Sequence, residues 1–260
     1  MTGAPAYDPE TETLDGMHHG RVRLIQPRRG YRFSVDAVLA AHFAPAAPSG
    51  LALDLGAGVG VIGLLLLDLG KAARVLGMEI QPELAALAER NAAANGYAAT
   101  QQTLCADFRN IETLITPQSA NLVVSNPPYF PAGRGRVNPS AQLTIARHEV
   151  AGAMTDLLRA AAYALAPDGA AVFVYPVTRE KELLQKLSEA GLRLSRRRRV
   201  HGKPGEPPRL VLVEARKGAV RDVVEEAPLV LEDADGRPMP EAEAIYAGTK
   251  PERGWGARPP

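Results

Sequence analysis

The chain has 260 residues, of which 46% are hydrophobic and 23% are charged, and its formal net charge is +1. This composition excludes a disordered or collagen-like protein and predicts one sizeable hydrophobic core. The small net charge excludes a global field that would attract nucleic acid or an anionic membrane, so only local basic clusters remain as candidate contacts.

The N-terminal part carries no pattern of secretion or membrane insertion. Its first 20 residues are polar and predict a weakly ordered lead, and the longest apolar stretch of the chain, Val59 to Leu67, is interrupted by glycines. A membrane span needs roughly 20 apolar residues. The single cysteine cannot form an internal disulfide. We therefore expect no membrane partner and a cytoplasmic location. Adjacent His18 and His19 lack further ligands at metal-binding spacing, which favours a solvated turn.

From residue 34 onward the sequence predicts regular elements. A short helix follows Ser34 and ends near Phe43, before Pro45. Strands are then expected at 51–55, 74–79, 101–105, 121–125 and 170–175, with helices at 60–69, 82–95, around 111, and at 154–165 and 178–190. This alternation predicts a parallel sheet with helices on both faces.

Two final apolar runs, 192–200 and 209–215, flank a loop rich in glycine and proline, which predicts an antiparallel hairpin at the sheet edge. The expected fold class is therefore α/β, a doubly wound, mostly parallel sheet of seven strands. We divide the chain into an N-terminal lead with a short helix (1–50), a main domain (51–218), and a C-terminal extension (219–260) that packs on that domain or is partly disordered.

A glycine-rich turn follows the first core strand, in the order Asp54, Gly56, Gly58 and Gly60. Glycine lets the backbone approach a ligand closely, and the next helix offers free N–H groups, so the turn predicts a nucleotide-like ligand. The spacing also fits a dinucleotide turn with Glu79 about 20 residues on, which makes NAD an alternative. Asp54 would repel a pyrophosphate but can orient water or an amino-acid ammonium. This acid favours S-adenosylmethionine over NAD.

These residues match the D-x-G-x-G-x-G pattern of class I methyltransferases, which the chain resembles. The resemblance implies S-adenosylmethionine as the cofactor, with Glu79 accepting hydrogen bonds from both ribose hydroxyls. It also implies that Asp107 accepts from the adenine amino group and that Phe108 lies beside the ring. A helix cap is the alternative role for Asp107. The chemistry needs no metal, and we expect none.

The fourth core strand ends in Asn126, Pro127, Pro128 and Tyr129, at the carboxyl edge where such sheets bind ligands. A conjugated amino nitrogen is a poor nucleophile because its lone pair is delocalised. If the Asn126 side-chain oxygen and the Pro127 carbonyl each accept one of its N–H groups, the lone pair is turned toward the methyl group. Tyr129 offers a ring for stacking. The motif predicts an sp2 nitrogen acceptor, either in adenine or in a glutamine side chain.

Flanking segments favour adenine. Residues 30–39, 146–149 and 227–246 resemble the bacterial adenine-N6 methyltransferases that modify the anticodon loop of valine tRNA. The resemblance extends over nearly the whole chain after residue 15 and implies an RNA substrate, tRNA in particular. Alternatives are methylation of ribosomal RNA, methylation of a protein glutamine, and an RNA-binding module without turnover. The glutamine enzymes carry a helical N-terminal domain, for which about 50 residues are too few.

Basic residues gather at 21–32, 134–147 and 193–203. Within them, Arg147, His148, Arg197 and Arg199 are candidate contacts to the RNA. The alternative for Arg147 and His148 is a surface pair with an adjacent acid. The alternative for Arg197 and Arg199 is protection of an edge strand against aggregation. The sequence predicts no particular oligomeric state.

Overall fold

A computed structural model describes residues 6–127 and 150–249. The strands are β1 (Glu12–Met17), β2 (Val22–Pro27), β3 (Ala47–Leu55), β4 (Ala72–Glu79), β5 (Gln101–Cys105), β6 (Ala120–Ser125), β7 (Leu165–Pro176), β8 (Leu192–His201), β9 (Pro208–Lys217), β10 (Val224–Glu225) and β11 (Leu229–Val230). The helices are α1 (Val35–Phe43), α2 (Val61–Asp68), α3 (Pro82–Ala94), η1 (Phe108–Thr113), α5 (Val150–Ala164), η2 (Val177–Arg179), α6 (Glu180–Glu189) and α7 (Pro240–Ala247). No helix of the described ranges is both long and apolar enough to cross a membrane.

The main sheet has the strand order β10-β8-β9-β7-β6-β3-β4-β5, and β11 also pairs with β8. Strands β3 to β7 are parallel, and β9 runs antiparallel to both β7 and β8. The expected mostly parallel sheet with an antiparallel hairpin is therefore confirmed, but the sheet has nine strands in place of the expected seven, because β10 and β11 pair with β8 beyond the hairpin. β3 has β4 on one side and β6 on the other, so the winding reverses there. In sheets of this type the ligand crevice lies at the carboxyl ends of the strands beside such a reversal.

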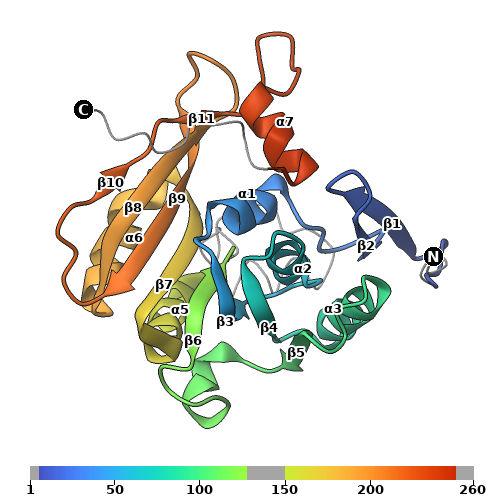
Figure 1. The fold of residues 1–260 in the computed structure, drawn as a ribbon, viewed down its shortest axis with the longest axis horizontal. Helices are drawn as coiled ribbons and strands as arrows, with labels where there is room; N and C mark the ends of the chain where they lie inside the picture. The colour runs from blue at the N-terminus through green and yellow to red at the C-terminus, as the bar shows by residue number, and fades with distance from the viewer. Residues whose placement is uncertain (1–5, 128–149, 250–260) are drawn as a thin grey trace.

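Helices cover both faces of the sheet and create two hydrophobic cores (Figure 1). The division is visible along β6, where Leu122 and Val124 belong to the core with α1, α2 and α3, whereas Val123 belongs to the core with α5 and α6. Alternate residues of a strand point to opposite faces, so a central strand buried on both sides has to be apolar throughout.

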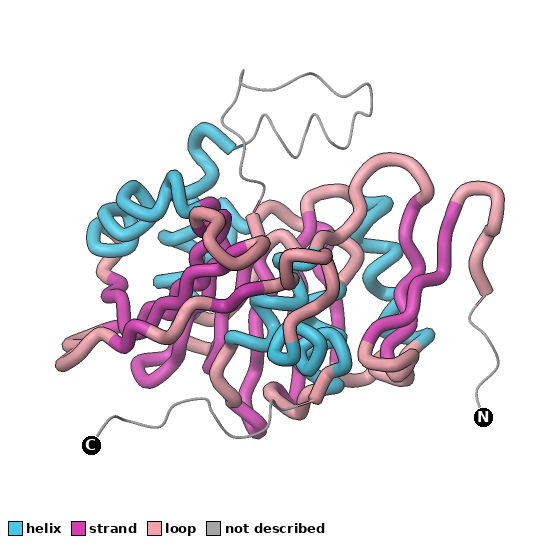
Figure 2. The backbone as a smooth tube through the Cα atoms, turned by 90° about the horizontal axis from the view of Figure 1, so that it is seen from above, coloured by secondary structure: helices cyan, strands magenta, loops and turns pink. Residues whose placement is uncertain are grey.

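The first segment is a β-hairpin, and the expectation of a weakly ordered lead is wrong for its described part. β1 and β2 pair antiparallel around a turn at His18, His19 and Gly20, which have φ values of 51°, 55° and 80°. Figure 2 shows the two strands set apart from the main sheet. The sequence conceals β1 because its residues are polar and mostly half-buried, without an alternation of apolar and polar positions.

The expected solvated turn is also wrong at His18, which is only 1% exposed. Its Nδ1 lies 2.5 Å from Oδ2 of Asp68 at the end of α2, and its Nε2 lies 3.3 Å from Nε2 of His42 in α1. Arg21 also pairs with Asp68, at 2.9 Å. The turn is thus fastened to the ends of two helices, through partners that are distant in the sequence.

β2 is joined to the core through α3 and not through the main sheet. The Asn91 side chain, fully buried, accepts a hydrogen bond from the Ile25 N–H at 2.7 Å and donates to the carbonyls of Ile25 and Val59, both at 3.0 Å. One turn later, Asn95 accepts from the Arg23 N–H at 2.8 Å and donates to its carbonyl at 2.7 Å. Two side-chain amides therefore take the place of strand pairing.

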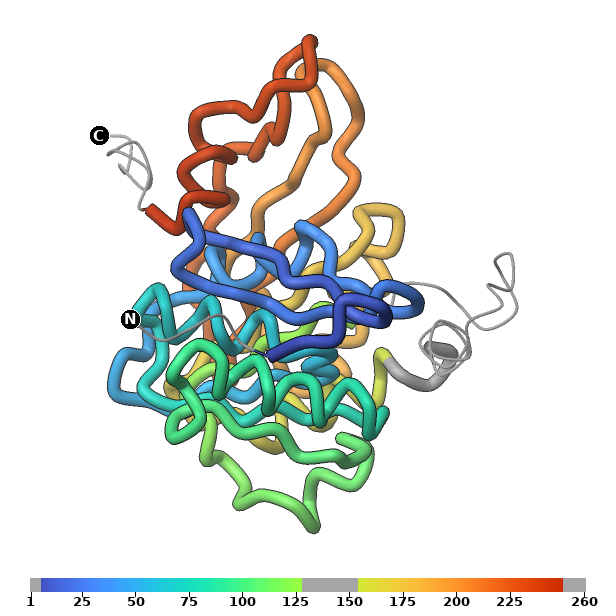
Figure 3. Tube along the Cα trace, turned by 90° about the vertical axis from the view of Figure 1, so that its right-hand side faces the viewer, coloured from blue at the N-terminus to red at the C-terminus, as the bar shows by residue number. Residues whose placement is uncertain are grey.

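The described part of the C-terminal extension packs on the domain. β10 and β11 run parallel to β8, and α7 buries Ala242 and Ile245 against the core beside α1. Arg198, 2% exposed, donates from both terminal nitrogens to the Glu241 carboxylate of α7 at 2.8 Å. Beyond α7, Arg21 donates to the carbonyl of Gly248 at 3.0 Å. The C-terminal helix consequently lies beside the N-terminal hairpin (Figure 3).

Replacing Asn91 by alanine should strongly destabilise the protein, because three buried backbone groups lose their partner. An unpaired buried group costs about 1–3 kcal/mol, so the free energy of unfolding should fall by roughly 3 kcal/mol or more in urea denaturation. Gln185→Ala removes an exposed amide on α6 that contacts Glu189 and should change it by less than about 0.5 kcal/mol. Equal effects of the two substitutions would contradict the anchoring role of Asn91.

Candidate active site

The turn after β3 is held by buried side chains from three other elements. Its glycines Gly56, Gly58 and Gly60 all have left-handed φ values, 79°, 57° and 81°. The Gly58 N–H donates to Oε2 of Glu79 at 2.8 Å, and the Gly60 carbonyl accepts from Nε2 of Gln101 at 3.0 Å. The Asn91 side chain donates to the carbonyl of Val59, between these two glycines. Together these contacts fix the turn at the carboxyl edge of the sheet.

Two of the three glycines are also required by their surroundings. A Cβ at Gly58 would lie 2.7 Å from Cε1 of Tyr31, and one at Gly60 would lie 2.8 Å from Nε2 of Gln101 and 3.0 Å from Cβ of Ala88. At Gly56 a Cβ would meet nothing within 4 Å. The first glycine therefore borders open space, as a turn that receives a ligand must.

Two carboxylates are buried beside this turn. Asp54 is 1% exposed, and neither of its oxygens has a hydrogen-bond partner in the described part of the chain. Burial, followed by the charge of Glu79, raises the pKa of Asp54 to about 7. Glu79 is 6% exposed, and burial raises its pKa although it accepts from the N–H groups of Gly58 and Gln81.

These two carboxylates fit a cofactor that brings positive charge and hydroxyl donors. Buried carboxylates without a partner are costly unless a cation or donors meet them. S-adenosylmethionine carries an ammonium and a sulfonium, which suit Asp54, and two ribose hydroxyls, which suit Glu79. Oε2 of Glu79 has a lone pair left beyond the bond from the Gly58 N–H, whereas Oε1 accepts from the Gln81 N–H at 2.9 Å and from its side-chain amide at 3.4 Å. A pyrophosphate would place further negative charge beside both acids.

The adenine-binding candidates lie after β5. Asp107 caps η1: its Oδ1 accepts from the Arg109 N–H at 2.9 Å and its Oδ2 from Nε of Arg109 at 2.7 Å. The side-chain hydrogen bond of Arg109 is the main cause that lowers the pKa of Asp107. Phe108 packs against the core with α5. The helix-cap role is thus observed, and a contact with adenine stays a prediction.

The end of β6 lies beside the glycine turn. Asp54 of β3 pairs with Val124 of β6, so Gly56 and Asn126 are at the same level two residues on. Ser125, fully buried, donates from Oγ to the carbonyl of Leu55 at 2.6 Å and joins the two strand ends. Pro127 is buried. The structure brings together the two motifs that the sequence analysis singled out; Pro128, Tyr129, Arg147 and His148 lie outside the described residues.

The two candidate arginines of β8, Arg197 and Arg199, are separated from β6 by strands β9 and β7, and they form ion pairs. Arg197 Nη1 is 2.7 Å from Glu180, and Arg199 Nη2 is 3.1 Å from the same carboxylate. Both also pair with Glu225 of β10. These contacts favour a structural role at the sheet edge, and a contact of these arginines with RNA stays a prediction.

Sequence reasoning missed the side chains that support the turn. Asn91 and Gln101, 0% and 2% exposed, occupy positions on a helix and a strand that no motif marks. Polar residues in helices and strands are ordinarily exposed. A polar residue on an otherwise apolar face is the available signal, and the row Leu84, Leu87, Ala88 and Asn91 of α3 shows it.

Residues 35–190 match the family model described as methyltransferase small domain. The chain belongs to this family. It is a class I S-adenosylmethionine-dependent methyltransferase, which confirms the family and the cofactor expected from the glycine turn. NAD is therefore not its cofactor.

Among relatives of this methyltransferase, a tRNA1(Val) (adenine(37)-N6)-methyltransferase from Tolumonas auensis is 30% identical over 222 residues, covering 85% of this chain and 90% of that protein. A protein of the same name from Porphyromonas gingivalis is 34% identical over 191 residues, covering 71% and 74%. A solved predicted O-methyltransferase from Agrobacterium tumefaciens has a TM-score of 0.65 at 22% identity, covering 82% of this chain and 95% of that one, which supports the fold.

The affinity of this methyltransferase for S-adenosylmethionine should depend on pH through Asp54, whose pKa is about 7. Below that pH the carboxyl is protonated and must lose its proton when the cationic cofactor binds. Affinity should rise by roughly tenfold from pH 5.5 to pH 7, while the cofactor's own ammonium stays protonated. Calorimetry measures the change. Asp54→Asn should bind more weakly at pH 7 and lose the pH dependence; a pH-independent wild type would contradict this role.

Proposed function

We propose that this enzyme transfers a methyl group from S-adenosylmethionine to the N6 amino group of an adenine in tRNA. The observation that carries the proposal is the position of Asn126 and Pro127 at the end of β6, level with the glycine turn. An amino group directed by these residues would face a methyl group held over the turn. The tRNA substrate is supported by the names of the two relatives described above.

When bound, the cofactor supplies an activated methyl group on its sulfonium. The residues of this chain have to position the acceptor and hold its two N–H groups. In our proposal the Asn126 side-chain oxygen and the Pro127 carbonyl accept these two hydrogen bonds and turn the nitrogen lone pair toward the methyl group. Proline restricts its own φ, which keeps its carbonyl aimed. Tyr129 would stack on the adenine. Catalysis then rests mainly on orientation.

The N-terminal segment favours RNA over a protein acceptor. In the described residues before α1 the structure has a β-hairpin, where the glutamine methyltransferases carry a helical domain. The loop between this hairpin and α1 bears Arg28 and Arg29, both exposed, and it also bears Tyr31, which contacts the glycine turn. We propose that these two arginines bind phosphates beside the site. A tRNA substrate would place the enzyme in the cytoplasm.

The proposed activity is tested by transfer of tritium from methyl-labelled cofactor into separate samples of tRNA, ribosomal RNA and a release factor. We expect label in tRNA, recovered after digestion as N6-methyladenosine. Label that appears only in ribosomal RNA would replace the substrate, and label in a protein glutamine would replace the acceptor. Label in none of the three, with the cofactor bound, would overturn the proposal.

Asn126→Ala removes one of the two proposed acceptors of the amino group. By analogy with the loss of one preorganised hydrogen-bonding group, single-turnover methylation should slow by roughly a hundredfold or more. Cofactor affinity should stay the same, because the lost contact is to the acceptor. Asn121→Ala, at the opposite end of β6, removes an amide that binds the Leu51 N–H and should leave the rate unchanged. Near wild-type turnover of Asn126→Ala would remove Asn126 from this role.

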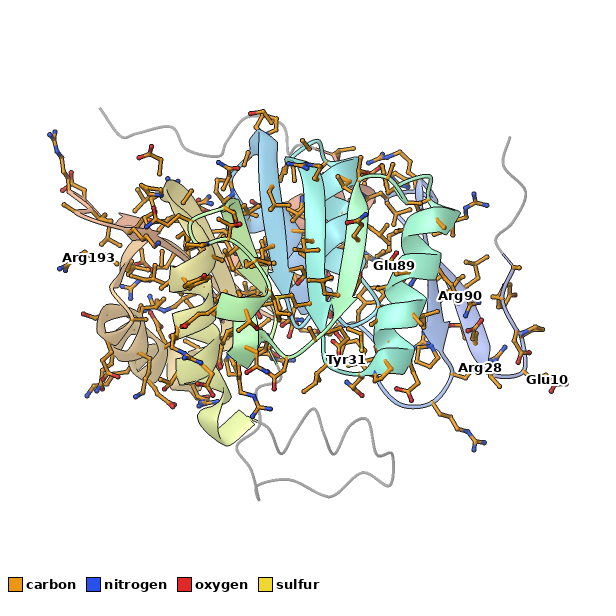
Figure 4. The ribbon with its side chains drawn as sticks, turned by 90° about the horizontal axis from the view of Figure 1, so that it is seen from below. Glu10, Arg28, Tyr31, Glu89, Arg90 and Arg193 are labelled. Atoms are coloured by element: carbon orange, nitrogen blue, oxygen red, sulfur yellow. The ribbon has the colours of Figure 1, made fainter. Side chains whose placement is uncertain are left out.

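The double variant Arg28→Ala, Arg29→Ala should bind tRNA more weakly and with less dependence on salt. The slope of log affinity against log salt should become shallower by about 0.7–0.9 for each phosphate contact that is lost. Arg193→Ala is the matched control, because this exposed arginine lies at the opposite side of the molecule in Figure 4. Equal slopes for the wild type and the double variant would show that the loop does not bind phosphate.

A further inference from the structure

Tyr31 lies against the middle of the glycine turn. It belongs to the loop between β2 and α1, and the phenol end of its ring is the part that approaches: a Cβ at Gly58 would be 2.7 Å from Cε1, 3.0 Å from Cζ and 3.0 Å from the hydroxyl oxygen. Figure 4 shows Tyr31 on the same side of the molecule as Arg28. An aromatic side chain from outside the sheet therefore borders the place where the backbone would approach the cofactor.

The charges of three acidic residues act on the Tyr31 phenol. Burial raises its pKa, and the charges of Glu79, Asp54 and Asp36 raise it further, in that order. Glu79 is the last residue of β4 and Asp54 is the last but one of β3, whereas Asp36 lies in the first turn of α1. The phenol thus stays protonated in the working pH range, so its hydroxyl is a hydrogen-bond donor beside Gly58.

The amino-acid end of S-adenosylmethionine has two needs in such a site. Its ammonium suits the carboxylates, but its α-carboxylate would be repelled by them unless a neutral donor meets it. A protonated phenol beside Gly58 supplies that donor.

We propose that the Tyr31 hydroxyl donates a hydrogen bond to the α-carboxylate of the bound cofactor, while the ring forms a wall over the glycine turn. Tyr31 is then a cofactor-contacting residue contributed by the N-terminal segment. The proposal rests on the cofactor site described above and is independent of which substrate receives the methyl group.

The loop is held firmly enough for this role. On one side of Tyr31, β2 is anchored to α3 through Asn91. On the other side, Arg32 donates to the carbonyl of Pro27 at 3.1 Å and pairs with Asp15 at 2.9 Å. The ring of Tyr31 packs against the core beside α1 and α2. A side chain with so little freedom loses little entropy when it meets the cofactor.

The test compares two ligands and two proteins by calorimetry, without RNA. Tyr31→Phe keeps the ring and removes the hydroxyl. S-adenosylmethionine carries the α-carboxylate, and decarboxylated S-adenosylmethionine lacks only this group. A hydrogen bond to a charged group corresponds to roughly a tenfold to hundredfold change in affinity, which we expect for Tyr31→Phe with the full cofactor. With the decarboxylated ligand, the two proteins should agree within about twofold.

Tyr163→Phe is the control, because this phenol on α5 contacts the carbonyls of Glu112 and Ile115, away from the turn. It should bind both ligands as the wild type does. Tyr31→Ala should weaken both ligands, since the wall is lost as well.

Three outcomes would overturn the inference. The first is an unchanged affinity of Tyr31→Phe for the full cofactor, and the second is an equal loss for both ligands, which would move the contact to the nucleoside. The third is tighter binding of the cofactor by Tyr31→Ala, which would show that Tyr31 obstructs the cofactor site. None of them depends on methylation of RNA, so failure of the proposed substrate would leave this result standing.

Discussion

The left-handed turn at residues 56–60 is the constraint on which the site depends. Three glycines in this conformation lose much entropy on folding, and the turn keeps its shape because other elements hold its backbone. Glu79 holds an N–H, and Asn91 and Gln101 hold two carbonyls. Asn91 also binds β2, so the side chain that shapes the turn anchors the hairpin as well. The loop that carries Tyr31 follows β2 directly, which places the ring and the turn under one common restraint.

The same turn gathers negative charge that the folded protein alone does not neutralise. The pKa of Asp54 lies at about 7, above its ordinary value of 3.8. For a group whose pKa is raised in the folded state, the stability present below pH 3.8 is lost as the pH rises through 7. At neutral pH the empty site therefore carries an electrostatic cost. A cation bound beside Asp54 and Glu79 offsets this cost, so the features that weaken the free enzyme favour a positively charged cofactor over a neutral or anionic one.

The parts of the fold that follow from local periodicity could be predicted from the sequence. β3, the glycine turn and α2 form a strand, turn and helix whose apolar pattern and glycines are all local. The N-terminal hairpin was not predicted, because β1 is held by partners that are distant in the sequence. One of them is Arg90 of α3, whose Nη1 lies 2.5 Å from Glu12. The arginines of β8 also show this limit. Their density suggested nucleic acid, yet Arg197 and Arg199 pair with carboxylates at residues 180 and 225, which no local pattern brings close.

Basic side chains stabilise the helices that border the site, and they do so at the C-terminal ends of those helices. Lys71 donates from Nζ to the carbonyls of Ala41 and Ala44, at 3.0 Å and 2.7 Å, where α1 ends. Arg21 pairs with Asp68, the last residue of α2. Positive charge at a helix C-terminus is favourable because it meets the negative end of the helix dipole. The starts of α1 and α2, beside Asp36 and Gly60, face the other way, so bracing the helices leaves the carboxyl edge of the sheet clear of these contacts.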